Sequence, residues 1–274
     1  TGKTMVSTSL ALAYRATQKK RLLFLDCDVE EPNARIFLKP EIAGRKEVTV
    51  PVPVVDKNKC TACGLCAEVC EYNAIMVNKK GKQVFPFHQL CHGCGACTLL
   101  CPVGAISETG RVTGVVEWGS AKGMDFADGT LRIGEAMAPP LIRAVKERLD
   151  GRGDAILDCP PGTACPVVAS VKGSDYCLLV TEPTPFGLND LKLAVDMMRE
   201  LGIPSGVVIN QSDIGDSGVR NYCEKERLSI LAEIPYDRGI AEGYARGMAA
   251  IETGPECEKT FADLLDAVMA EARR

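Results

Sequence analysis

The sequence is poor in aromatic residues, has no excess of basic residues and has no long hydrophobic run. Aromatic residues make up 5% of the 274 residues and apolar residues 46%, so a large core must be built mainly from aliphatic side chains. The formal net charge of −4 argues against a general nucleic-acid-binding protein, because no basic field attracts a phosphate backbone. No apolar run reaches the length of a membrane span, so stable membrane insertion is not expected.

Cysteine, in contrast, is abundant, and eight of the 14 cysteines form one pattern that occurs twice. Each copy reads C-x2-C-x2-C-x3-C. An offset of 31 residues superposes the copies and also matches Gly64 with Gly95 and Ala74 with Ala105, which indicates an internal duplication. The copies consist of Cys60, Cys63, Cys66 and Cys70, and of Cys91, Cys94, Cys97 and Cys101.

This spacing is typical of iron–sulfur cubes. Three thiolates can surround one cube on a tight loop, and in the bacterial two-cluster arrangement the fourth cysteine of each run ligates the other cluster. Pro102 follows Cys101 as the pattern expects, whereas Glu71 follows Cys70, a departure that removes a constraint on chain direction but no ligand. The predicted [4Fe–4S] ligand sets are Cys60, Cys63, Cys66 and Cys101 for cluster 1, and Cys91, Cys94, Cys97 and Cys70 for cluster 2.

Two other uses of cysteine fit less well. Zinc sites usually contain two C-x2-C pairs separated by a longer insert, and disulfides are unusual in an enzyme-like, cytosolic chain. The remaining cysteines are scattered along apolar segments, which suits free, reduced thiols and a cytoplasmic location. They are Cys27, Cys159, Cys165, Cys177, Cys223 and Cys257.

The segment Thr1-Gly2-Lys3-Thr4 has the form of the second half of a phosphate-binding loop, G-x-x-x-x-G-K-[ST]. A helix-compatible run follows, so these residues are expected at a helix N-terminus, where backbone N–H groups and the helix dipole favour phosphate. Lys3 is expected to reach the β- and γ-phosphates, and the Thr4 hydroxyl to ligate Mg²⁺. The strand and first glycines of the motif are expected upstream of Thr1.

Two short apolar runs end in acids. Residues 21–28 suit a strand buried on both faces of a parallel sheet, with Asp26 and Asp28 at the carboxyl end, where open α/β sheets bind ligands. An ordinary solvated strand end is the alternative interpretation. Residues 154–158 and the following Cys-Pro-Pro-Gly look like a Walker B strand and its switch loop, so Asp158 would hold Mg²⁺ through water and Gly162 would let the loop respond to the γ-phosphate.

Strand-like and helix-like runs alternate along the rest of the chain, which predicts an α/β protein with a doubly wound, mostly parallel sheet. Segment 259–274 is expected to pack on the core as a helix, because the acids on its polar face disfavour contact with anionic lipid. Further strands are expected at 111–116 and 129–133 and within 176–183, 204–211 and 228–236, and helices at 141–149, 189–201 and 221–227.

Five motifs follow one another along the chain: Thr1–Thr4, Asp26 with Asp28, Asp158 with Pro-Pro-Gly, residues 181–183 (Thr-Glu-Pro) and Asn210. With these motifs in this order, the chain resembles the MinD/Mrp class of deviant P-loop ATPases (SIMIBI class). It looks like the subgroup with a two-cluster ferredoxin inserted after the second strand. The resemblance implies ATPase parts at 1–50 and 111–274, and an inserted bacterial-ferredoxin-like α+β domain at 51–110.

The resemblance also implies roles for single residues. Asp28 matches the switch I acid that orients or activates the attacking water, and together with Lys3 and Asp158 it would be catalytic. Asn33 matches a family asparagine, and Asn210 matches the residue that reads the adenine edge. The signature lysine of the deviant loop would precede Thr1. Nucleotide-binding residues would be Gly2, Lys3, Thr4, Asn210 and the loop over the base, Pro235, Tyr236 and Asp237.

Together these features predict an ATPase that binds ATP and Mg²⁺, couples nucleotide state to two [4Fe–4S] clusters, and acts on a redox or metallocluster-carrying partner protein by electron delivery or metallocluster assembly. A homodimer, or a heterodimer with a related ATPase, is expected. Two alternatives stay open: a ferredoxin-type electron carrier whose nucleotide-binding scaffold does not hydrolyse ATP, and a MinD-like positioning ATPase with redox-sensing clusters.

Overall fold

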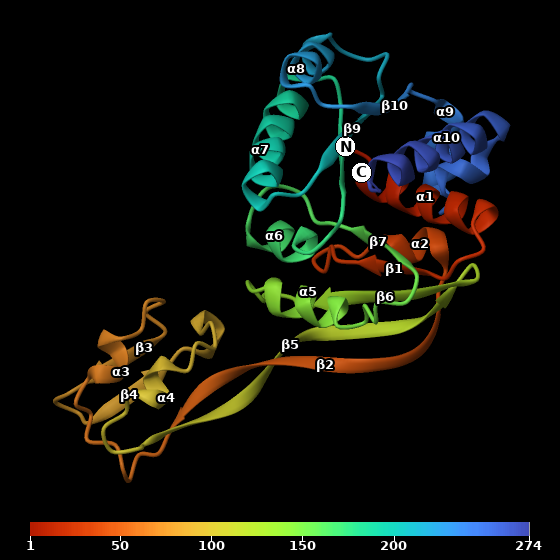
Figure 1. The fold of residues 1–274 in the computed structure, drawn as a ribbon. Coiled ribbons are helices and arrows are strands. Elements are labelled where there is room, and N and C mark those ends of the chain that lie inside the picture. Colours follow the sequence, from red (N-terminus) through yellow and green to blue (C-terminus); the bar gives the residue numbers. More distant parts are fainter. Residues whose placement is uncertain (274) are drawn as a thin grey trace.

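A computed structural model describes residues 1–273, which form a main body and a smaller lobe (Figure 1). We call the smaller lobe, residues 56–105, the cysteine lobe. A long antiparallel ribbon joins it to the main body and consists of β2 (Glu41–Val55) and β5 (Ile106–Ala121). The ribbon begins inside the main sheet and extends well beyond it, so the cysteine lobe projects from the body (Figure 1).

The main sheet has the strand order β2-β5-β6-β1-β7. Its remaining strands are β1 (Leu22–Asp26), β6 (Met124–Leu131) and β7 (Asp154–Asp158). Strand β1, between β6 and β7, is buried along its whole length, as its apolar run predicts, and it is parallel to both neighbours. The register places Asp26 between Asp128 and Asp158, so three acids lie side by side on adjacent strands.

A second, parallel sheet has the order β10-β9-β8 and consists of β8 (Cys177–Thr181), β9 (Ser205–Asn210) and β10 (Ile230–Ile234). The predicted α/β class with mostly parallel strands is confirmed, although the described strands of the main body form two hydrogen-bonded sheets and β3 and β4 of the cysteine lobe form a third. Strands β7 and β8 border a cavity of about 570 Å³. One core still joins the sheets, because it contains Phe24 of β1, Val208 of β9 and Phe261 of the C-terminal helix.

Helices surround these sheets. The C-terminal helix α10 (Pro255–Glu271) buries Phe261, Leu264 and Leu265 against α1 (Lys3–Thr17), which confirms the predicted packing helix; Arg274 of that segment lies outside the described residues. Among the described helices, none has both the length and the apolar character needed to cross a membrane. The other helices of the body are α2 (Ala34–Leu38), α5 (Pro139–Lys146), α6 (Cys165–Val171), α7 (Pro185–Leu201), α8 (Gly218–Glu226), α9 (Arg238–Ala245) and the 3₁₀ helix η2 (Ala250–Thr253).

The ribbon is the part of the fold that the sequence analysis describes least well. Strand β2 was not predicted: it is exposed along most of its length and contains Pro51 and Pro53, which an edge strand tolerates but a central strand does not. The predicted strand at 129–133 is wrong in its bounds. A turn at Lys122-Gly123, where both residues have positive φ, starts β6 at Met124 instead.

The cysteine lobe repeats one local structure twice. Each copy has a short helix that starts directly after a left-handed glycine, Gly64 (φ 98°) or Gly95 (φ 74°). The predicted domain boundaries fall inside the ribbon on paired residues, because Val50 pairs with Arg111 and Pro51 with Gly110. The elements of the lobe are α3 (Leu65–Glu68), β3 (Ile75–Asn78), β4 (Gln83–Pro86), the 3₁₀ helix η1 (His88–Leu90) and α4 (Ala96–Leu99).

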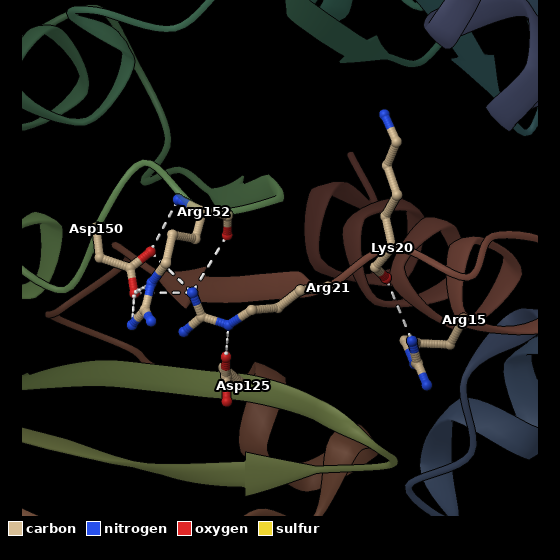
Figure 2. A network of polar contacts seen from close by, with 6 residues as sticks. All are labelled: Arg15, Lys20, Arg21, Asp125, Asp150 and Arg152. Carbon is tan, nitrogen blue, oxygen red and sulfur yellow. Dashed lines mark hydrogen bonds and ion pairs between the residues drawn. The ribbon is translucent and has the colours of Figure 1, made fainter.

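At the amino end of β1, Arg21 joins three chain segments (Figure 2). Its guanidinium donates to Asp125 of β6, to both carboxylate oxygens of Asp150 at 2.8 Å, and to the main-chain oxygen of Arg152 at 3.2 Å. These contacts hold β1, β6 and the segment before β7 together at the edge opposite the three acids.

At the base of the ribbon the backbones of β2 and β5 approach each other closely, and a substitution can test how much this close approach contributes to stability. A Cβ added at Gly119 would collide with the main-chain oxygen of Glu41 on the paired strand, so Gly119→Ala must displace β2 from β5. We expect the free energy of unfolding to fall by about 1–3 kcal/mol. Urea unfolding followed by the fluorescence of Trp118, the single tryptophan, measures this effect.

The matched control is Gly254→Ala. A Cβ at Gly254 meets no atom within 4 Å, and its φ of 166° is extended backbone. This variant should unfold close to the parent protein. An equal decrease in the free energy of unfolding in the two variants would contradict a specific role for the close approach at Gly119.

Candidate functional site

The residues predicted to bind nucleotide converge at the carboxyl ends of β1, β7 and β9. Helix α1 begins at Lys3, and Gly2 before it adopts φ 84°, a conformation that favours glycine. A Cβ added at Gly2 would lie 2.6 Å from Nδ2 of Asn210, the last residue of β9. The structure therefore brings the start of α1 and Asn210 together, although Gly2 and Asn210 are 208 positions apart in the sequence.

Asp158, at the end of β7, is 2% exposed and carries the clearest electrostatic signature. Burial raises its pKa to about 6; a hydrogen bond with the Thr4 side chain lowers it, nearby Asp28 raises it, and Lys3 and Ser7 lower it. Its Oδ2 is buried and has no hydrogen-bond partner among the described residues. A buried, unpartnered carboxylate oxygen beside a threonine hydroxyl fits a Mg²⁺ ion held through water.

The loop after β1 carries Asp28 and is held by Asp26. Oδ1 of Asp26 accepts from the Asp28 N–H at 3.1 Å, and its Oδ2 accepts from the Ala34 N–H at 3.0 Å. Burial and then Asp158 raise the pKa of Asp26 well above its ordinary value. Burial also raises the pKa of half-buried Asp28, while the Glu31 N–H and Lys3 oppose the shift. Asp26 thus positions the loop, a role the sequence analysis did not assign.

The same loop is tied to the ribbon by Arg35, which the sequence analysis missed. Arg35 follows the predicted family residue Asn33 by two positions and lies on α2. Its Nε donates to Asp128 of β6 at 2.7 Å, and its Nη2 donates to Glu117 of β5 at 2.8 Å. Burial raises the pKa of fully buried Asp128, and Arg35 opposes this. An arginine two residues from a loop asparagine carries no sequence signal; only the register reveals its partners.

Residues predicted to surround the base lie at this same edge. Asn210 pairs with Ile234 at the end of β10, so the loop from Pro235 to Asp237 starts next to it. Tyr236 is half-exposed, and its N–H donates to Asp213 at 2.6 Å. Asp237 accepts from two backbone N–H groups as the N-cap of α9. The Asp237 carboxylate therefore already has a structural role.

The structure sorts the eight duplicated cysteines into two cavities of the cysteine lobe. Each cavity contains three cysteines of one copy and the last cysteine of the other, which is the exchange that the spacing predicts. Among the described residues, no three Cys, His, Asp or Glu side chains are placed to hold a single metal ion. One cavity is lined by Cys60, Cys63, Cys66 and Cys101, and the other by Cys70, Cys91, Cys94 and Cys97.

Backbone N–H groups point at equivalent thiols in the two copies. Burial raises the pKa of the Cys66 and Cys97 thiols, and neighbouring thiols of the same set also raise it. Backbone N–H groups that donate to sulfur stabilise thiolates, so each cavity offers four sulfurs in the surroundings that a [4Fe–4S] cluster requires. The N···S distances are 3.4 Å from Ala62 to Cys60 and from Gly93 to Cys91, 3.3 Å from Ala74 to Cys70, and 3.2 Å from Ala105 to Cys101.

Known proteins share both halves of this arrangement. Residues 32–107 match the family described as the 4Fe-4S dicluster domain. An uncharacterized protein of Methanocaldococcus jannaschii is 28% identical over 255 residues, covering 90% of this chain and 86% of the relative. The iron–sulfur cluster carrier protein of Pyrococcus horikoshii is 30% identical over 137 residues, covering 41% of this chain and 45% of that relative.

Among solved structures, the septum site-determining protein MinD of Pyrococcus horikoshii, complexed with Mg-ADP, superposes with a TM-score of 0.60. It is 17% identical, and the match covers 100% of this chain and 93% of that one. The chain thus has the MinD/ParA-type P-loop ATPase fold and carries a 4Fe-4S dicluster ferredoxin domain, as the sequence predicted. Parts of its sequence are also similar to a protein named cytosolic Fe-S cluster assembly factor NUBP1 homolog of Caenorhabditis briggsae, which is 27% identical over 139 residues, 42% of this chain and 44% of the relative.

The buried carboxyl of Asp158 predicts a pH-dependent stability. Its folded-state pKa of about 6 lies above the ordinary carboxyl value, so its contribution to stability is full below about pH 4 and is lost as the pH rises through 6. Asp158→Asn should therefore stabilise the Mg²⁺-free, nucleotide-free protein at neutral pH by about 2–3 kcal/mol and flatten this pH dependence. Urea unfolding across this pH range measures both effects.

Asp263→Asn is the control, because Asp263 is exposed on α10. It should leave the pH dependence unchanged. The same pH profile for Asp158→Asn and the parent protein would show that the Asp158 carboxyl does not titrate in this range.

Proposed function

We propose that this protein is an iron–sulfur ATPase that binds and hydrolyses ATP–Mg²⁺ and couples its nucleotide state to two [4Fe–4S] clusters. It would act on a redox or metallocluster-carrying partner protein, by electron delivery or metallocluster assembly. The observation that carries the proposal is the convergence of Lys3, Thr4, Asp28 and Asp158 in a chain whose duplicated cysteines line two four-thiol cavities. The names of its relatives, iron–sulfur cluster carrier proteins, and of its fold neighbour MinD with Mg-ADP support it.

In this proposal each residue of the site has a defined task. The backbone N–H groups at the start of α1 and the Lys3 ammonium bind the β- and γ-phosphates. Thr4 and Asp158 hold Mg²⁺, which when bound neutralises phosphate charge. Asp28, half-buried and close to Lys3, orients the attacking water. Gly2 keeps the loop open beside Asn210, which reads the adenine edge, and Pro235, Tyr236 and Asp237 close over the base.

The Asp28 loop and the clusters are physically connected. Asp26 holds the loop to β1, and Arg35 holds the end of the loop to Glu117 of the ribbon. A loop that changes shape with the γ-phosphate would shift these contacts at the ribbon base, and the ribbon carries the cysteine lobe. This chain of contacts favours an ATPase over the alternative of an electron carrier on an inert scaffold.

The assembly and location are inferred from the resemblance to MinD/Mrp ATPases. We expect a homodimer, or a heterodimer with a related ATPase, in the cytoplasm. A MinD-like positioning ATPase with redox-sensing clusters would share the nucleotide site, and ATP-dependent binding to liposomes would distinguish it.

Lys3→Ala tests the nucleotide site. Loss of the ammonium at the phosphates should lower the rate of ATP hydrolysis by about 10²–10³-fold, while the iron content stays near two cubes per chain. The control is Lys20→Ala, because the Lys20 side chain extends away from its neighbours (Figure 2). Hydrolysis retained in Lys3→Ala would refute the phosphate-loop assignment, and a parent protein that ignores ATP would favour the electron carrier.

The coupling route is tested by removing the ion pair without leaving a buried charge. Arg35→Gln together with Asp128→Asn should leave hydrolysis within a fewfold while reducing the change that ATP causes in the cluster reduction potentials. Redox titration of the anaerobic protein with and without ATP measures that change. Arg21→Gln with Asp125→Asn, at the opposite edge of the sheet, is the matched control. A full ATP effect in the first double variant would contradict the route.

A further inference from the structure

The two cavities of the cysteine lobe are matched in most features that set a cluster's reduction potential. Each cavity has one N–H···S bond to the first cysteine of one copy and one to the last cysteine of the other copy. The thiols are also matched in exposure: Cys63 and Cys94 are exposed, and the other six are partly buried. Hydrogen bonds to sulfur and solvent exposure are two of the main determinants of the potential, and the charge around the cluster is a third.

Charge is where the copies differ. At Gly64, in the cluster 1 loop, an added Cβ would lie 3.1 Å from the ammonium nitrogen of Lys79. At the equivalent Gly95, in the cluster 2 loop, it would lie 3.3 Å from Oε1 of Glu108. The Thr98 hydroxyl donates to the same Oε1 at 3.0 Å and holds the carboxylate there, and Glu108 lines the cluster 2 cavity. Equivalent positions of two duplicated loops therefore face opposite charges.

This difference is absent from the repeated pattern itself. With the offset of 31 residues, Lys79 corresponds to Gly110 and Glu108 corresponds to Val77. Each copy has thus acquired one charged residue whose counterpart in the other copy is uncharged. Neither residue forms part of the four-cysteine pattern or of the predicted ligand sets.

We propose that Lys79 and Glu108 make the two clusters inequivalent, so that cluster 1 accepts an electron before cluster 2. This rests on the two-cluster part of the proposed function. A [4Fe–4S] cluster with four thiolates is an anion, and one-electron reduction adds one further negative charge. The Lys79 cation favours that added charge and raises the potential of cluster 1, whereas the Glu108 carboxylate lowers the potential of cluster 2. A low-potential donor supplies the electron, which then resides mainly on cluster 1.

Two other charged groups near the loops affect the design of the test. Lys59, next to Cys60, lies 3.8 Å from Asp56, so its charge is offset. His92 lines the cluster 2 cavity and stacks on Tyr72 with ring centroids 3.6 Å apart. Every variant is therefore measured at the same pH, so that His92 contributes equally throughout.

The test is a redox titration of the full-length anaerobic protein, followed by electron paramagnetic resonance. The parent protein should show two potentials. Lys79→Met should lower the higher one, and Glu108→Gln should raise the lower one. Both side chains are exposed, so each change should alter the partition of the electron between clusters about two- to fivefold, or about 20–40 mV. The double variant should show the smallest gap, and higher salt should narrow the gap of the parent protein.

Two variants control for position. Lys80→Met removes the same charge from the neighbouring residue of the same turn and should shift the higher potential less than Lys79→Met. Val77→Glu places a carboxylate at the cluster 1 position equivalent to Glu108 and should lower the higher potential.

The inference is overturned if Lys79→Met moves the lower potential, if Glu108→Gln moves the higher one, or if Lys80→Met has the full effect of Lys79→Met. Iron analysis and spin quantification separate this result from a failure of the proposed function. A protein without two four-iron clusters contradicts that function. Two clusters whose potentials shift equally in each of these variants contradict only the proposed inequivalence.

Discussion

Three acids on adjacent parallel strands, Asp128, Asp26 and Asp158, are the constraint on which the rest of this structure depends. All three are buried, so each charge needs a partner or an ion to offset the loss of water. Asp26 is bound by backbone N–H groups of its own loop, and Asp128 by the guanidinium of Arg35. Asp158 has the Thr4 and Ser7 side chains, and one oxygen of Asp158 and one of Asp128 have no hydrogen-bond partner among the described residues. Asp26 and Asp128 therefore hold neighbouring segments in place, whereas Asp158, beside Lys3 and Thr4 at the start of α1, is the acid placed to meet a ligand.

The different partners of these acids determine what the neighbouring segments can do. Because Asp26 accepts from the N–H groups of Asp28 and Ala34, the main chain at both ends of the 28–34 loop is held to the end of β1. Because Arg35 bridges Asp128 and Glu117, the end of that loop is fixed to two strands of the sheet. One of these, β5, continues out of the body as the ribbon. The base of the ribbon is fixed further by Trp118, whose ring lies 4.3 Å from the Arg148 guanidinium carbon.

Much of this site could be predicted from sequence because cluster ligands and strand-end acids occur at short, regular spacings along the chain. The duplication of the eight cysteines predicts their exchanged pairing, and Asp28 and Asp158 were predicted from the apolar runs that precede them, although a solvated strand end was an alternative for the first run. Arg35, Glu117 and Asp128 could not be found in this way, since their contact depends on strand register between distant segments. Strand β2 was missed for a related reason: its exposed, proline-containing sequence lacks the apolar run of a central strand, and it is ordered by pairing with β5.

The ribbon separates the candidate nucleotide site from the two four-thiol cavities of the cysteine lobe. Strands β2 and β5 pair along the whole ribbon, from Glu41 with Ser120 at its base to Val55 with Ile106 at the cysteine lobe. Its base is restrained by Arg35, Trp118 and the close approach of Gly119 to β2. A small shift at the base is therefore enlarged at the far end, as in any lever held at one end. Within the cysteine lobe, in contrast, each four-thiol cavity takes cysteines from both copies, so the two clusters would move as one unit. Nucleotide state would then change where the pair points, and the fixed charges of Lys79 and Glu108 would decide which member of the pair holds the electron.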